Sequence, residues 1–255
     1  MRATWRSAIS FAWAAIVGLA ASVANGAECG ADALGTSRVL EIDAKTTPRV
    51  GKPFAPMPSL SAHEVVLTFD DGPRSTTTAH VLDALARQCV KATFFVIGEN
   101  GVARPDLLRR ERADGHSIGY HTWSHPLLDR VPLGVGEAEI DHGIDAVERV
   151  VYGEAHPPPT RFFRFPGLAA PAALLERLTT RGIVTFGADL WASDWRPMTP
   201  DAELKLVLQR LDGAGRGIVL FHDTKAQTAA MLPQFLEALR KQNYRIVAVA
   251  PAPGP

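Results

Sequence analysis

Two histidines four positions apart give the clearest chemical signal in this sequence. His121 and His125 are near enough along the chain to bind one ion, and Pro126 follows the second of them. Because proline disfavours helical angles in the residue before it, the pair is predicted to lie in a turn. Two imidazoles and one carboxylate form a common catalytic zinc set that leaves room for water and substrate. Asp71, the second of two adjacent aspartates, is the expected third ligand.

Other ionisable residues stand where apolar runs of the sequence end. Asp70 and Asp71 end one run, His222 ends another, Arg164 lies at a third, and Asp194 follows a fourth. In a barrel of alternating strands and helices, functional groups gather at the carboxyl ends of the strands. The alternative interpretation of the histidine pair is two surface residues in a loop. The repeated placement of polar residues favours a shared metal site instead.

These residues depend for their positions on a regular alternation of predicted strands and helices. Apolar and β-branched runs predict seven strands, over residues 65–69, 92–97, 116–120, 162–165, 184–188, 218–221 and 245–249. Amphipathic stretches predict helices, over residues 77–88, 105–114, 137–151, 171–180, 200–211 and 229–241. Such alternation implies a parallel sheet, and no glycine-rich dinucleotide-binding motif follows the first strand. The predicted fold class is α/β, a single (β/α) barrel of seven strands that is distorted or incompletely closed.

Five short motifs occur in an order that resembles the polysaccharide deacetylase family, which is carbohydrate esterase family 4 and has the NodB homology domain. The motifs are Thr68-Phe69-Asp70-Asp71-Gly72-Pro73, His121-Thr122-Trp123-Ser124-His125, Arg164-Phe165-Pro166-Gly167, Asp194-Trp195 and Leu220-Phe221-His222-Asp223. The resemblance covers about residues 63–250. It implies a metal-dependent hydrolase that removes N-acetyl or O-acetyl groups from a polysaccharide or oligosaccharide, such as peptidoglycan or chitin oligomers.

The resemblance implies catalytic roles for four side chains. Asp70 would be the general base, and Arg164 would orient it and lower its pKa. His222 would be the general acid that protonates the leaving amine, and Asp194 would tune it. The divalent metal would be Zn²⁺, with Co²⁺, Ni²⁺ or Mn²⁺ compatible with the same donors. The expected metal ligands are Asp71, His121 and His125.

Three further residues are expected to contact the substrate. The resemblance implies that Trp195 and Leu220 line a pocket for the acetyl methyl group. It also implies that the backbone N–H of Gly167 stabilises the oxyanion. The sequence departs from the family at two positions, because Gly167 stands where tyrosine is frequent and Trp191 where an aspartate is usual. These departures bear on sugar specificity more than on the chemistry.

The first 26 residues have the pattern of a secretory signal peptide. Arg2 and Arg6 precede the apolar run 8–21, and small residues follow it. An uncleaved membrane anchor is the alternative, although the run is shorter than the roughly 18 residues that a span needs. The mature protein is therefore expected in the periplasm or outside the cell, with no stable membrane span after cleavage.

Beyond the signal peptide (1–26), the sequence predicts an extended N-terminal leader (27–62) and one NodB-like domain (63–250). The leader is rich in proline, which disfavours regular structure. Its Cys29 and the later Cys89 are the two cysteines of the chain. An oxidising compartment permits a bridge between them, and two unlinked thiols are the alternative.

The expected partner is a carbohydrate polymer or oligomer and not a nucleic acid. The 27 basic residues equal the 27 acidic ones, so no basic excess is available to bind phosphates. Two other functions stay open. One is a metal-dependent amidohydrolase acting on small cyclic amides, which is usually cytosolic chemistry. The other is a catalytically silent glycan-binding protein, which would not need an acid–base pair beside a metal.

Overall fold

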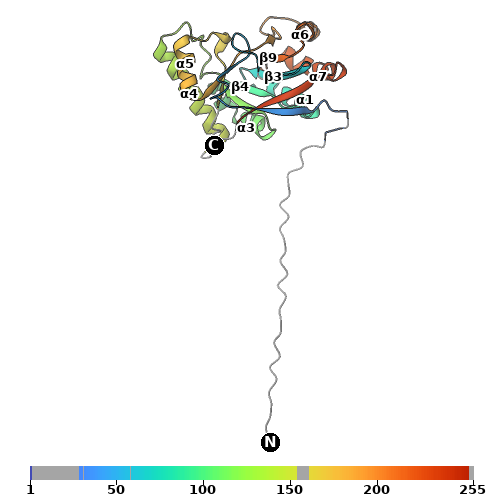
Figure 1. Cartoon of the computed structure of the whole chain (residues 1–255), viewed down its shortest axis with the longest axis horizontal. Helices are drawn as coiled ribbons and strands as arrows, with labels where there is room; N and C mark the ends of the chain where they lie inside the picture. Colours follow the sequence, from blue (N-terminus) through green and yellow to red (C-terminus); the bar gives the residue numbers. More distant parts are fainter. Residues whose placement is uncertain (2–28, 31, 58, 154–160, 253–255) are drawn as a thin grey trace.

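The computed structural model has one sheet of ten strands, within the residues it describes, and helices packed around that sheet (Figure 1). It describes residues 1, 29–30, 32–57, 59–153 and 161–252. The strands are β1 (Thr36–Ile42), β2 (Arg49–Val50), β3 (Glu64–Asp70), β4 (Thr93–Val96), β5 (Ser117–Tyr120), β6 (Arg161–Phe163), β7 (Ile183–Phe186), β8 (Leu190–Trp191), β9 (Gly217–His222) and β10 (Arg245–Pro251). The helices are α1 (Thr77–Arg87), α2 (Gly98–Ala103), α3 (Pro105–Ala113), α4 (Leu133–Tyr152), α5 (Ala172–Thr180), α6 (Pro200–Ala214) and α7 (Ala226–Lys241), with a 3-10 turn η1 (Pro166–Leu168).

The strands curve into a barrel that stays open. They follow the order β8-β9-β3-β4-β5-β6-β7-β2, and β10 joins the start of β3 and carries β1. The strand pairings are parallel. In the described part of the chain, the terminal strands β8 and β2 do not pair with each other. The predicted fold class, an α/β barrel that is distorted or incompletely closed, is confirmed.

All seven predicted strands are present, with ends shifted by two residues at most. The predicted number of strands is nevertheless wrong, because β1, β2 and β8 also join the sheet. β2 and β8 have two residues each, which is too few to show a periodicity in the sequence. β1 is an outer strand whose side chains alternate between half-buried and exposed positions. Because prolines follow β1, this segment was assigned to the extended leader and the strand was not predicted.

The leader predicted over 27–62 therefore contains regular structure, since β1 pairs with β10 and β2 pairs with β7. The signal peptide predicted over 1–26 lies outside the described residues, apart from Met1. None of the helices in the described chain is both long and apolar enough to cross a membrane. The boundaries of the signal peptide, leader and domain stay predictions.

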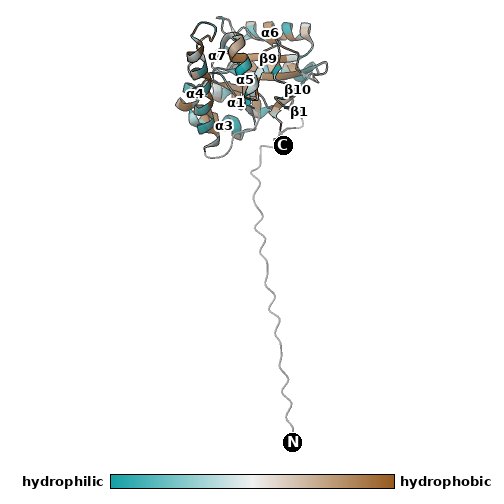
Figure 2. Cartoon of the chain, turned by 60° about the vertical axis from the view of Figure 1, so that its left-hand side comes forward, coloured by the Kyte–Doolittle hydropathy of each residue, from teal (hydrophilic) through white to brown (hydrophobic). Residues whose placement is uncertain are grey.

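Alternate residues of each central strand face two different cores. Val65, Leu67 and Phe69 of β3 pack beneath the helices, whereas Val66 belongs to a second apolar cluster inside the barrel. Figure 2 shows the central strands mostly brown, while helices such as α3 and α4 carry both colours. Because successive side chains of a strand point to opposite faces, Asp70 lies on the inner face with Val66.

β9 follows the same pattern beside β3. Val219 and Phe221 pack beneath the helices, and Ile218 belongs to the inner cluster. Leu220 and His222 therefore face the interior of the barrel. The alternation thus puts an acid and an imidazole on one inner wall, at the carboxyl ends of two adjacent strands.

A disulfide joins Cys29, which precedes β1, to Cys89, which follows α1. The two Cα atoms are 5.9 Å apart, and the bridge spans a sequence separation of 60 residues. Of the two possibilities that the sequence left open, the structure has the linked form. In a chain-entropy account, closing a loop of this length stabilises a fold by about 4 kcal/mol.

We expect Cys89→Ser to melt roughly 8–16 °C below the wild type, because the unfolded variant regains the freedom of this loop. Calorimetry under non-reducing conditions measures the difference. Wild-type protein reduced with dithiothreitol is the matched control and should melt at the temperature of the variant. Equal melting temperatures for variant and oxidised wild type would show that the bridge does not constrain the chain.

Candidate active site

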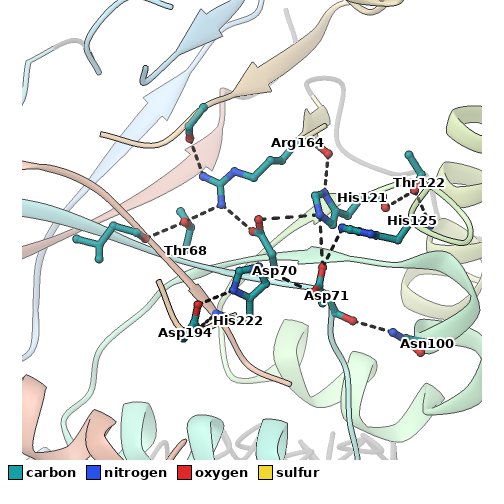
Figure 3. A network of polar contacts seen from close by, with 12 residues as sticks. Thr68, Asp70, Asp71, Asn100, His121, Thr122, His125, Arg164, Asp194 and His222 are labelled. Carbon is teal, nitrogen blue, oxygen red and sulfur yellow. Dashed lines mark hydrogen bonds and ion pairs between the residues drawn. The ribbon is translucent and has the colours of Figure 1, made fainter. Parts of the chain in front are cut away.

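Asp70 and His222 end neighbouring strands at the same level of the sheet, as register partners in the pairing of β3 with β9. A cavity of about 620 Å³ lies at these carboxyl ends. Its lining includes eight of the ten site residues predicted from the sequence, namely Asp70, Asp71, His121, His125, Gly167, Trp195, Leu220 and His222. The other two, Arg164 and Asp194, are buried behind it and contact Asp70 and His222 (Figure 3). The structure therefore brings all ten together.

Asp71, His121 and His125 form a cluster that could hold a metal ion (Figure 3). Oδ1 of Asp71 lies 3.5 Å from Nε2 of His121 and 3.4 Å from Nε2 of His125. Donors that bind one tetrahedral zinc ion at about 2.0–2.1 Å stand about 3.3 Å from one another, which is close to these separations. The same Asp71 oxygen is buried and has no hydrogen-bond partner among the described residues. These residues fit a divalent cation.

The imidazole of His121 is held in the form that a metal ligand needs. Its Nδ1 lies 2.6 Å from the carbonyl oxygen of Arg164, so Nδ1 carries the hydrogen and donates it. Nε2 is then left with a lone pair that faces Asp71. Burial lowers the pKa of His121 to about 3, against the opposing charge of Asp71, so the ring stays neutral.

Helix α4 supports the turn that carries the two histidines. Thr122 and His125 both have a φ of 64°, and the turn lies outside any helix, as the sequence predicted. The carboxylate of Glu139 accepts the backbone N–H of Ser124 at 2.8 Å. Gly143 allows the helix to approach closely, because a Cβ there would lie 2.4 Å from the carbonyl carbon of Thr122. The turn that carries His121 and His125 therefore rests directly on the α4 backbone.

Asp70 and Arg164 form a fully buried ion pair. Nη1 of Arg164 donates to Oδ1 of Asp70 at 2.7 Å, and Nη2 donates to the carbonyl oxygen of Gly187 at 2.7 Å. Burial raises the pKa of Asp70, and this effect outweighs the lowering by the Arg164 charge. The contact and the lowering effect of Arg164 were predicted correctly, but the prediction left out burial, which gives the net pKa shift the opposite direction. A raised pKa makes the Asp70 carboxylate a stronger proton acceptor.

Asp194 holds His222 through both of its carboxylate oxygens. Oδ1 lies 2.7 Å from Nδ1 of the imidazole, and Oδ2 accepts the backbone N–H of the same residue at 2.6 Å. Burial lowers the pKa of His222, but the hydrogen bond and charge of Asp194 outweigh burial and raise it to about 9. His222 is therefore protonated near neutral pH, and its Nε2 is turned away from Asp194.

We expect Asp194→Asn to lower the pKa of His222 from about 9 toward the ordinary value of roughly 6.5. Asparagine can still accept the Nδ1–H, but without the negative charge of Asp194 burial is opposed mainly by the smaller effects of Asp70 and Asp71. NMR titration of the imidazole in the zinc-loaded protein measures the shift. Asp212→Asn, a change on α6, is the control and should leave the titration unchanged. An unaltered His222 pKa in Asp194→Asn would show that Asp194 does not set it.

Two tryptophans and a glycine shape the mouth of the cavity. Trp191 and Trp195 are 37% and 48% exposed, and the Trp195 ring stands edge-on to His222 with 6.1 Å between centroids. Gly167 has a φ of 61°, and a Cβ there would meet Leu127 at 2.8 Å. Both the backbone angle and the space therefore favour glycine at 167. The two departures from the family pattern, Gly167 and Trp191, both lie on this cavity.

Sequence reasoning missed residues that hold the site without lining it. Asn100 donates to the carbonyl oxygen of Asp71 at 2.7 Å, and Glu139 holds the turn that carries His121 and His125. Thr68 accepts Nη1 of Arg164 at 2.8 Å. One signal could have identified Thr68, because it lies two positions before Asp70 and so faces the same side of the strand. Nothing in the local sequence distinguishes Asn100 or Glu139 from other polar residues.

The fold and the site define a class of protein, an open (β/α) barrel with a cluster of possible metal ligands at the carboxyl ends of its strands. The family model described as polysaccharide deacetylase matches residues 58–186. A chitin deacetylase of Colletotrichum lindemuthianum is 34% identical over 197 residues, covering 72% of this chain and 77% of that protein. The chain belongs to the polysaccharide deacetylase family.

Two further comparisons involve peptidoglycan deacetylases. A peptidoglycan-N-acetylglucosamine deacetylase of Listeria monocytogenes is 36% identical over 186 residues, covering 72% of this chain and 38% of that protein. The structure of a Bdellovibrio bacteriovorus peptidoglycan deacetylase superposes with a TM-score of 0.74 at 32% identity, covering 84% of this chain and 59% of that one. The chain thus spans well under two thirds of the length of the Listeria relative.

Proposed function

We propose that this chain is an exported, metal-dependent carbohydrate deacetylase that hydrolyses N-acetyl or O-acetyl groups on peptidoglycan, chitin oligomers or a related glycan. One observation carries the proposal, which is the convergence of three units on one cavity. These units are the metal-ligand cluster, the Asp70–Arg164 pair and the Asp194–His222 pair. A silent glycan-binding protein would need no such combination of base, acid and ligand set.

Asp71, His121 and His125 would hold the divalent ion. Zn²⁺ suits two imidazoles and a carboxylate, and Co²⁺, Ni²⁺ and Mn²⁺ are compatible with the same donors. When bound, the ion supplies Lewis acidity, which polarises the acetyl carbonyl and acidifies water. The buried Oδ1 of Asp71, which has no hydrogen-bond partner in the described part of the chain, supports this assignment.

The remaining steps fall to groups of the chain itself. Arg164 engages Oδ1 of Asp70, and Oδ2 faces the cluster, 4.0 Å from Nε2 of His121. Asp70 would therefore take a proton from the attacking water through Oδ2. The Gly167 N–H would donate to the oxyanion of the tetrahedral intermediate. His222, whose Nε2 lies 3.9 Å from Oδ2 of Asp71, would then protonate the leaving amine.

The tryptophans at the mouth of the cavity support a glycan as the substrate. The disulfide supports export of the protein. Exposed tryptophans such as Trp191 and Trp195 offer flat apolar faces to the C–H faces of sugar rings. Leu220 lines the cavity beside His222 and would contact the acetyl methyl group. The Cys29–Cys89 bridge agrees with an oxidising compartment reached through the predicted signal peptide at 1–26.

We expect zinc-loaded protein beginning at residue 27 to release acetate from at least one of peptidoglycan, chitin oligomers and acetylated xylan. Asp70→Asn is the matched control, since it keeps the size of the base and removes its charge, and it should lose most of the activity. Hydrolysis of cyclic amides without acetate release from glycans would support the amidohydrolase alternative. Glycan binding without acetate release would support the silent binding protein.

A further inference from the structure

Two more side chains continue the Asp194–His222 pair into the interior of the protein. The hydroxyl oxygen of Thr228, on α7, lies 2.9 Å from Oδ2 of Asp194 and 2.8 Å from Oε1 of Glu203, on α6. Thr228 and Glu203 are fully buried, and neither lines the cavity. A continuous chain of hydrogen bonds therefore runs from His222 to the packed helix pair.

The geometry at Thr228 limits which groups can be ionised. A threonine hydroxyl has one hydrogen and can donate it to only one acceptor at a time. The Thr228 oxygen lies 2.9 Å from the Asp194 carboxylate and 2.8 Å from that of Glu203. If both were ionised, one of them would face the lone pairs of the hydroxyl oxygen with no hydrogen atom between the two oxygens. One of the two carboxyl groups must therefore carry a proton and donate it to the Thr228 oxygen.

Asp194 is the ionised member of this pair. One of its oxygens faces the Nδ1–H of His222 and the other accepts a backbone N–H, so both are committed as acceptors. Glu203 forms no salt bridge with a described residue, the charge of His222 affects its pKa less than burial does, and its buried Oε2 has no hydrogen-bond partner there. An isolated buried carboxylate is much more costly than a neutral carboxylic acid. Burial also raises the pKa of Glu203 to about 7, which likewise favours the neutral carboxylic acid.

We propose that Glu203 is a protonated positioning residue, which donates to Thr228 so that Thr228 donates to Asp194 and holds it against His222. The proposal rests on the proposed function, because the group being positioned is the general acid of that reaction. With Glu203 neutral, the hydrogen bonds from Thr228 on one side and from His222 on the other all donate toward a single negative charge on Asp194. That charge faces Nδ1 of His222 and leaves Nε2 directed at the cavity.

Thr228→Val tests the hydroxyl, since valine has nearly the same shape and no donor. We expect kcat on an N-acetylated chitin oligomer to fall on the order of tenfold to a hundredfold, with KM unchanged. The loss should be smaller on an activated aryl acetate, whose leaving group needs little protonation. Thr228→Ser restores the hydroxyl and should stay near the wild type. Equal losses on both substrates, or no rescue by serine, would show that Thr228 serves only the packing and would overturn the proposal.

Glu203→Gln tests the proton, because a side-chain amide can donate to Thr228 as the carboxylic acid does. We expect this variant to keep nearly full activity, and a loss as large as that of Thr228→Val would overturn the proposal. The infrared difference spectrum between wild type and Glu203→Gln, both zinc-loaded and slightly acidic, should contain the carbonyl band of a protonated acid. An absent band would mean an ionised Glu203 and would also overturn it. Because this measurement needs no turnover, it stays decisive even if the wild type releases no acetate and the proposed function fails.

Discussion

Replacing His222 with alanine is expected to slow acetate release from an N-acetylated glycan by a factor on the order of 10²–10⁴. An amine cannot leave as an anion, so the reaction needs a proton donor at the nitrogen. His222 is suited to this task, because the hydrogen bond and charge of Asp194 outweigh burial and raise its pKa to about 9. Acetate release under substrate-saturating and substrate-limited conditions gives kcat and kcat/KM for the variant and the wild type.

The choice of substrate separates the role of His222 from general damage to the site. An activated aryl acetate needs little protonation of its leaving group, so the variant should lose much less activity on this ester. Zinc content should match that of the wild type, because His222 is not one of the three proposed ligands. If the ester and the amide lost equal activity, or if the variant lost its metal, His222 would not be the general acid.

Removing the metal is expected to reduce acetate release to the background rate, and added zinc or cobalt should restore it. Without the ion, the acetyl carbonyl is not polarised, and water at the site keeps a high pKa. The buried Oδ1 of Asp71 would also be left without a hydrogen-bond partner among the described residues. Treatment with a chelator, followed by metal analysis and the acetate assay, measures both effects. Full activity in protein shown to be metal-free would contradict the proposed role of the cluster.

His121→Ala should reproduce the effect of the chelator, because it removes one of the three ligands and weakens metal affinity strongly. Its matched control is His80→Ala, which removes an exposed histidine on α1. The control should bind zinc and release acetate as the wild type does. Normal zinc binding by His121→Ala would show that the ion lies elsewhere.

The residues of the candidate site could be identified from the sequence because the ends of strands can be recognised from neighbouring residues alone. A polar residue at the end of an apolar run must lie at the carboxyl end of a strand, and parallel strands bring such ends to one side of the sheet. This reasoning placed Asp70 and His222 together although they are far apart in the chain, and the register of β3 with β9 confirms it. The turn at His125 was likewise predicted from the proline that follows it.

Short elements could not be found in the same way. β2 and β8 owe their extended form to the strands they pair with, since two residues show no pattern of their own. The bridge between Cys29 and Cys89 was equally undecided, because a disulfide depends on the distance between two Cα atoms that local sequence does not report.

The sequence by itself determined which residues form the candidate site and most of the strands at whose ends they lie, although β8, which precedes Asp194, was not predicted. Only the tertiary structure decided the electrostatics of that site. Arg164 was expected to lower the pKa of Asp70, yet burial raises it further than the guanidinium lowers it. The packing of α6 on α7 brings Glu203 to Thr228, which in turn contacts Asp194. No local pattern in the sequence predicts this arrangement. The physical reason is that strand periodicity depends on neighbouring residues, whereas burial and hydrogen-bond partners depend on every segment packed around a group.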